Sequence, residues 1–242
     1  MKLLSVLTGL FTFIAFPAFA QNVSDAFDPS YSLQSWQDPQ LAKVRANCRN
    51  PAPVFVIPAR EPQSGAMEAP AMEVIPTSSS IPNVVGADQE WELVWSWNGN
   101  QADGHIATED GGLMFANNDA SNVIRLNLDG SAEIVYENTN TGGALSRSKN
   151  GDLFLLNRGL NSSIVKLEPE RHILADKING DPLDCLSGIM NDLVADSLGG
   201  VYFTISRAGF FYADADGIVT QYGDDVIATN GVILSPDEDK VY

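Results

Sequence analysis

Short apolar runs separated by turn residues dominate the chain from about residue 90 onward. One such unit has apolar residues at 193–195, turn residues at 196–200 and β-branched or aromatic residues at 201–204. Glycine accepts the positive φ of a tight turn, and β-branched and aromatic residues favour strands. The unit is therefore predicted to be a β-hairpin, with the polar pair Asn191 and Asp192 at its entrance.

The same unit recurs at 104–116, 143–156 and 230–242. The equivalent turn positions lie 39, 49 and 40 residues apart, at Gly112, Gly151, Gly200 and Lys240. A repeat of short strands at this length is typical of propeller blades. The third and fourth strands of successive blades are expected at 122–128 and 131–137, 162–168 and 171–176, and 209–214 and 217–222. We predict an all-β propeller without long helices over residues 88–242.

The stretch from Trp91 to Trp97 alternates apolar and polar residues, as a half-buried strand does. We expect the propeller to begin with this strand. Its three tryptophans suit outer-strand and core packing, and a carbohydrate-stacking platform is the alternative.

The first 87 residues have a different character. Residues 1–20 are predicted to be a signal peptide, because an apolar run follows Lys2 and an A-x-A cleavage site ends at Ala20. The mature protein is expected to be periplasmic or secreted and to keep no membrane anchor. Residues 21–87 are predicted to be an N-terminal extension, with a short helix within 38–47 and a proline-rich linker or surface strap over 51–82. Within it, 54–57 could pair as an edge strand.

The charge of the chain limits which molecules it can bind. The 242 residues carry a net charge of −17, which argues against nucleic acid, since phosphate binding needs a basic surface. The acidic surface suits solubility, and carboxylates at a pore mouth would also favour cations. The two cysteines, Cys48 and Cys185, could form one disulfide in an exported protein or remain as two buried thiols.

Four segments carry a family resemblance: Gly-Asp-Leu-Phe-Leu-Leu-Asn at 151–157, Ser-Ile-Val-Lys-Leu at 163–167, Met-Asn-Asp-Leu-Val-Ala-Asp at 190–196 and Thr-Asn-Gly-Val-Ile-Leu-Ser-Pro-Asp at 229–237. Together they resemble the gluconolactonase branch of the SMP-30/gluconolactonase/luciferin-regenerating-enzyme family. The resemblance implies a six-bladed propeller with a divalent metal, usually calcium, on its axis. Only three to four blades fit into residues 88–242, so we expect the sequence to be a C-terminally truncated fragment of a longer reading frame.

The resemblance also implies metal ligands. Asn191 and Asn230 match the family's asparagines that contact or adjoin the metal, and amide oxygens suit calcium. Taken alone, both could be turn asparagines that bond their own backbone. Asp103 stands where the family has the glutamate of a Glu-Gly-Pro-type motif. It is one methylene shorter, so the metal would shift or a water would intervene.

Three further residues are expected near a substrate. His105 would line the channel, or else be a hydrogen-bonded channel or surface histidine. Arg158 could touch substrate or be a surface residue, and Asp192 could support the site or be a turn carboxylate. The family's aspartate that serves as ligand and general base has no counterpart before Tyr242, so the catalytic residue is unknown.

The implied activity is metal-assisted hydrolysis of a small sugar-type lactone, in which calcium polarises the carbonyl and a carboxylate activates water. The sequence contains no Gly-x-Ser-x-Gly elbow and no Cys/His zinc spacing. The alternatives are hydrolysis of other esters or phosphotriesters on the same scaffold, and a non-catalytic binding propeller that has lost its metal.

Overall fold

The computed structural model describes residues 32–54, 80–86, 89, 92–96, 102–223, 225–226 and 228–242. The predicted signal peptide with its cleavage site, and most of the proline-rich segment, lie outside these ranges. In the described part of the chain, no helix combines the length and the apolar character needed to cross a membrane.

Three four-stranded antiparallel sheets follow one another along the chain, and each keeps sequence order. The first blade is β1 (Ala102–Ala107), β2 (Leu113–Asn117), β3 (Asn122–Leu126) and β4 (Ala132–Tyr136). The second is β5 (Gly142–Arg147), β6 (Leu153–Asn157), β7 (Ser163–Glu168) and β8 (His172–Ala175). The third is β11 (Ile189–Ala195), β12 (Val201–Ser206), β13 (Gly209–Ala213) and β14 (Val219–Tyr222).

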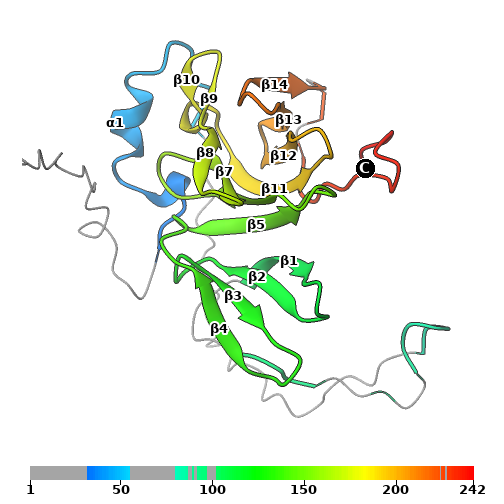
Figure 1. Cartoon of the computed structure of the whole chain (residues 1–242). Helices are drawn as coiled ribbons and strands as arrows, with labels where there is room; N and C mark the ends of the chain where they lie inside the picture. The colour runs from blue at the N-terminus through cyan, green and yellow to red at the C-terminus, as the bar shows by residue number, and fades with distance from the viewer. Residues whose placement is uncertain are drawn as a thin grey trace, which may run out of the picture.

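The first strand of each sheet lies innermost. Strand β5 contacts both β1 and β11, and Figure 1 shows the three sheets fanning out from this shared edge. The predicted all-β propeller is thus confirmed as a partial propeller, with three blades in the described residues.

The repeated turns explain the repeated sequence. The glycines that close the first hairpin of each blade, Gly111, Gly151 and Gly199, have φ values of 89°, 91° and 89°. Residues that carry a side chain rarely adopt a φ in this left-handed region, so glycine is the residue that the turn requires. The hairpins predicted from turn chemistry therefore form where expected.

Strand β6 shows how the blades stack. Its side chains alternate between two faces, as in any strand. Leu153 and Leu155 pack into the apolar cluster shared with the first blade, whereas Phe154 and Leu156 pack into the cluster shared with the third. Full burial of such a side chain stabilises the fold by about 1.5–3 kcal/mol. Strand β6 is buried on both faces, which accounts for its continuous apolar run.

The predicted strand at Trp91–Trp97 is wrong for its described part. Residues 92–96 form no strand, and Leu93 and Val94 are 71% and 56% exposed. Trp91 and Trp97 lie outside the described residues. A segment of alternating apolar and polar residues forms a strand only where a neighbouring strand pairs with its backbone. The first blade begins with β1, so in the described part of the chain residues 92–96 have no strand to pair with. Trp95 instead packs its ring edge-on against Phe115, with centroids 4.8 Å apart.

The predicted hairpin at 230–242 forms in reduced length. Leu234 and Val241 make an isolated bridge, and Ile233 and Tyr242 exchange backbone hydrogen bonds of 3.1 and 2.8 Å. Asp192 holds its start, because Oδ2 accepts a hydrogen bond of 2.9 Å from the Val232 amide.

The extension forms two short helices, η2 (Ser35–Gln37) and α1 (Leu41–Arg45), in agreement with the helix predicted within 38–47. The longest blade spacing, between the second and third blades, holds β9 (Lys177–Ile178), β10 (Asp181–Pro182) and η3 (Leu183–Cys185). From here on, the strap means residues 32–48, which precede the proline-rich segment, and the insertion means residues 176–188.

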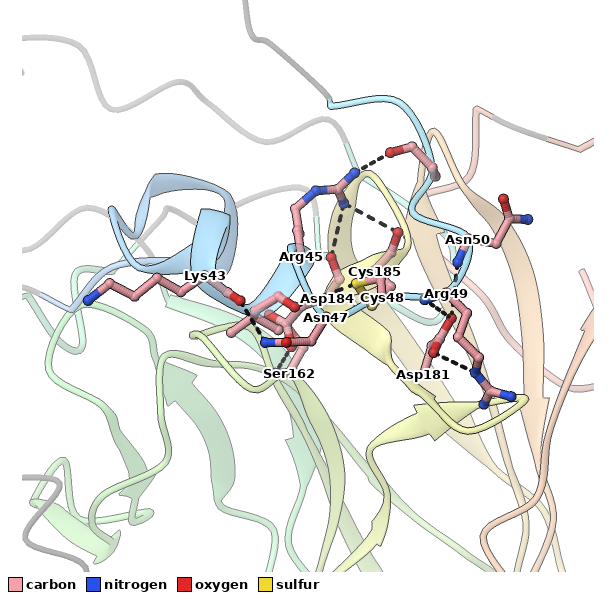
Figure 2. Close-up of a disulfide and its surroundings, with 12 residues drawn as sticks. Lys43, Arg45, Asn47, Cys48, Arg49, Asn50, Ser162, Asp181, Asp184 and Cys185 are labelled. Carbon is pink, nitrogen blue, oxygen red and sulfur yellow. Dashed lines mark hydrogen bonds and ion pairs between the residues drawn. A yellow bond between two sulfur atoms is a disulfide. The ribbon is translucent and has the colours of Figure 1, made fainter.

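A disulfide joins the strap to the insertion. Cys48 and Cys185 are bonded across 137 residues of sequence, with their Cα atoms 5.9 Å apart. Of the two alternatives that the sequence allowed, the bridge is the one that forms (Figure 2).

Candidate functional site

A buried arginine joins all three blades at their inner edge. Arg158, directly after β6, is 5% exposed, and its Nη2 lies 2.8 Å from Oδ2 of Asp103 on β1. The same nitrogen donates to the backbone oxygen of Asn191 on β11. Two of the residues expected as metal ligands and one expected as a substrate contact therefore meet in one cluster.

A β-bulge marks each inner strand at this level. The register shifts between Asp103 and Ile106 in β1, between Gly142 and Ala144 in β5, and between Met190 and Leu193 in β11. Bulges break the alternation of side chains and re-aim them, and they are common beside active sites. The sequence repeat gave no sign that the bulges align.

Gly143 makes room for the arginine. A Cβ built on this residue would lie 1.8 Å from Nε of Arg158, so only glycine leaves the space that the guanidinium fills. Nε itself is buried without a hydrogen-bond partner. The role of Gly143 was missed in the sequence, where it was only the start of a repeat.

The remaining expected residues differ in their surroundings. Nδ2 of Asn191 donates to Ser206 Oγ at 3.1 Å, which leaves Oδ1 as its acceptor atom. Asn230 is exposed, and its backbone oxygen accepts a hydrogen bond of 2.5 Å from Thr204 Oγ1. This bond, together with the one from Val232 to Asp192, fixes the Asn230 loop beside β11.

Asp192 is a supporting carboxylate in this geometry. Its Oδ1 accepts from the Leu193 amide at 2.9 Å, in addition to the bond that Oδ2 receives from Val232. Burial is the largest influence and raises the pKa of Asp192, while the two amides oppose the rise. Both oxygens are thus engaged by backbone amides.

His105 lies apart from this cluster. It is exposed, and its ring centroid is 5.7 Å from that of Phe115, which also packs against Trp95. In a regular strand, residues 103 and 105 would share a face, but the bulge at Gly104 breaks the alternation. The structure does not bring His105 to Arg158.

The oxygen donors at the inner edge fit a hard cation such as Ca²⁺. Asp103 offers a half-exposed carboxylate, Asn191 its Oδ1, and Asn230 an exposed amide. Within the described ranges, no three Asp, Glu, His or Cys side chains gather as metal ligands, so amide oxygens would have to complete the set. If a cation bound here, the carboxylate of Asp103 would coordinate it and lose its ion pair with Arg158.

The substitution Gly143→Ala is expected to displace the guanidinium of Arg158. The added Cβ would force Arg158 to swing out and lose Asp103, and overpacking of this kind costs about 1–3 kcal/mol. Urea unfolding of Gly143→Ala measures the loss. The same substitution in an Arg158→Ala background should cost much less, because the steric conflict is gone. Equal costs in the two backgrounds would contradict this account of Gly143.

Comparisons with known proteins agree with this architecture. The family description SMP-30/Gluconolactonase/LRE-like region matches residues 101–242. A solved gluconolactonase from Xanthomonas campestris aligns at 18% identity with a TM-score of 0.50, covering 58% of this chain and 52% of that one. Virginiamycin B lyase from Staphylococcus aureus aligns at 14% identity with a TM-score of 0.45, covering 62% and 50%. No curated protein sequence matches.

The chain therefore spans about half the length of the solved structures that it resembles. The family match covers more than half of this chain and all three blades described above. The chain belongs to the SMP-30/gluconolactonase/LRE-like family.

Proposed function

We propose that the complete protein hydrolyses a small sugar-type lactone with the help of a divalent cation, most simply Ca²⁺. The observation that carries the proposal is the cluster in which Arg158 links Asp103 to Asn191 at three aligned bulges. Family membership and the likeness in fold to a gluconolactonase support the reaction class.

Asp103, Asn191 and Asn230 are the residues that would hold the cation. When bound, the cation would act as a Lewis acid on the ester carbonyl. Arg158 keeps a fixed positive charge at the same place, and such a preorganised charge favours negative charge that develops on a reacting oxygen. Asp192 keeps the Asn230 loop against β11.

We also propose that the protein works outside the cytoplasm. The N-terminal sequence has the order of a signal peptide, and disulfides persist in oxidising compartments.

The proposal is tested by lactone hydrolysis, followed as acid release from gluconolactone at constant pH. Asn191→Ala is expected to lower kcat/KM by at least about tenfold, as expected for a group that contacts the reacting centre or its cation. The control is Asn150→Ala, which removes an amide bonded to Ser197 in an exposed hairpin turn and should leave the rate unchanged. Hydrolysis that survives both chelation and Asn191→Ala would sink the mechanism.

A non-catalytic binding propeller is the second candidate. One observation favours it: Asp103 is already paired with Arg158. If the protein is a binding propeller, added Ca²⁺ should leave its melting temperature unchanged and it should not hydrolyse lactones. If it is a lactonase, added Ca²⁺ should raise its melting temperature and it should hydrolyse lactones.

A further inference from the structure

The strap lies outside the segment matched by the family but touches the loop that carries Arg158. The backbone amide of Ser35 donates to the backbone oxygen of Arg158 at 2.7 Å. On either side of this contact, Ser32 donates to the backbone oxygen of Asp119 at 2.8 Å, and Thr141 Oγ1 donates to the backbone oxygen of Leu33 at 3.0 Å. The strap thus runs across loops of the first and second blades.

A buried carboxylate connects the strap, the Arg158 loop and the insertion. Asp184, in η3, is 5% exposed and accepts hydrogen bonds from Ser35 Oγ and, at 3.0 Å, from the Ser162 amide. Ser162 Oγ in turn donates to the backbone oxygen of Gly159, the residue after Arg158, at 3.1 Å. Burial raises the pKa of Asp184, and these donors oppose the rise.

The insertion anchors the strap a second time through charge and the disulfide. Arg45 Nη1 donates to the backbone oxygens of Asp184 and Cys185 at 3.1 and 3.3 Å. Arg49, directly after the strap, pairs with Asp181 at 3.1 Å. Figure 2 shows these contacts gathered around the bridge between Cys48 and Cys185. Both anchors lie in the longest of the three blade spacings.

The space between strap and blades is small. A cavity of about 40 Å³ is lined by Trp36 and Arg45 of the strap, by Arg158 and Met190 of the blades and by Asp184 of the insertion. Such a volume has room for only a few water molecules. The strap is therefore packed onto the loop of Arg158.

We propose that the strap positions Arg158, and that Asp184 is the positioning residue through which it acts. Loss of the Asp184 contacts would free the 158–162 loop, and the guanidinium would leave Asp103 and Asn191 more often. The disulfide keeps the strap in place for this purpose. The proposal makes no use of a substrate and does not depend on the lactonase function.

The experiment follows hydrogen exchange of the Arg158 side chain by NMR in the full chain. Because Nε of Arg158 is buried, its N–H exchanges with water only when the side chain leaves its place. Its signal is identified by its disappearance in Arg158→Lys. Asp184→Asn leaves one acceptor oxygen for the Ser162 amide and removes the negative charge. The hydrogen bonds to Ser35 and Ser162 are then no longer charge-assisted and weaken, so Nε–H exchange should accelerate by about tenfold or more.

Asp196→Asn is the matched control. Asp196 is also 5% exposed and also accepts from backbone amides and a hydroxyl, those of Leu198, Gly200 and Tyr212. It lies in the hairpin turn of the third blade, away from the strap. Asp196→Asn is expected to lower stability and to leave Arg158 exchange within about twofold of wild type, because distant sites act independently.

Opening the disulfide with a reductant should accelerate Arg158 exchange as Asp184→Asn does. Exchange that is unchanged in both Asp184→Asn and the reduced protein would overturn the proposal. Equal acceleration by Asp196→Asn would also overturn it, because the effect would then be general destabilisation.

Discussion

Replacing Gly104 with alanine is expected to lower the free energy of unfolding by roughly 2–5 kcal/mol, the combined cost of backbone strain and overpacking. A Cβ at this position would lie 2.4 Å from the Ala144 Cα and 2.5 Å from the Leu145 backbone nitrogen. Both are backbone atoms of the neighbouring blade and cannot rotate away. Gly104 also has φ +60°, which side chains rarely adopt. The midpoint and slope of urea unfolding measure the effect.

Gly130→Ala separates the two contributions. Gly130 has φ +81°, but a Cβ there meets no heavy atom within 4 Å. It should therefore show the backbone strain alone, about 1–2 kcal/mol. If the two variants unfolded at the same urea concentration, close approach of the first and second blades would not be the reason for glycine at 104.

Removing the disulfide is expected to cost about 2–5 kcal/mol, in the range seen when a native bridge that closes a long loop is lost. The bridge between Cys48 and Cys185 spans 137 residues and so restricts the unfolded chain strongly. Cys48→Ser combined with Cys185→Ser gives the measurement without leaving a free thiol. Urea unfolding of this variant should show a lower midpoint than that of the oxidised wild type.

A reductant provides the control for this prediction. It should lower the unfolding midpoint of the wild type to that of the double variant and leave the double variant unchanged. If reduction left the wild-type midpoint where it was, the strap would be held by its hydrogen bonds, such as those of Arg45 and Ser35, and the bridge would add little.

The Arg158 cluster gives these stability changes a consequence at the site. Gly104 follows Asp103, which pairs with Arg158, and Cys185 follows Asp184, which bonds Ser162 in the loop after Arg158. The bulges in the inner strands make this level of the propeller irregular where the rest of each blade is regular. Irregular backbone next to candidate ligands is consistent with a site that the regular sheet alone could not build.

The sequence by itself determined the blades. Hairpin turns at Gly111, Gly151 and Gly199 and the short apolar strands beside them, such as β6, depend on residues close together in the chain, so local chemistry was enough to predict them. The resemblance likewise pointed to Asn191, Asn230 and Asp103 as a group.

Only the tertiary structure decided how these residues meet. The pairing of Arg158 with Asp103 joins positions 55 residues apart, and the disulfide joins positions 137 apart. Bulges moved His105 away from Asp103 although the two are near neighbours in sequence, and the alternating segment before β1 formed no strand at 92–96. The physical reason is the same in each case. Strand register, bulges and strand pairing depend on contacts with residues that are distant in the sequence, and a local sequence repeat does not specify those contacts.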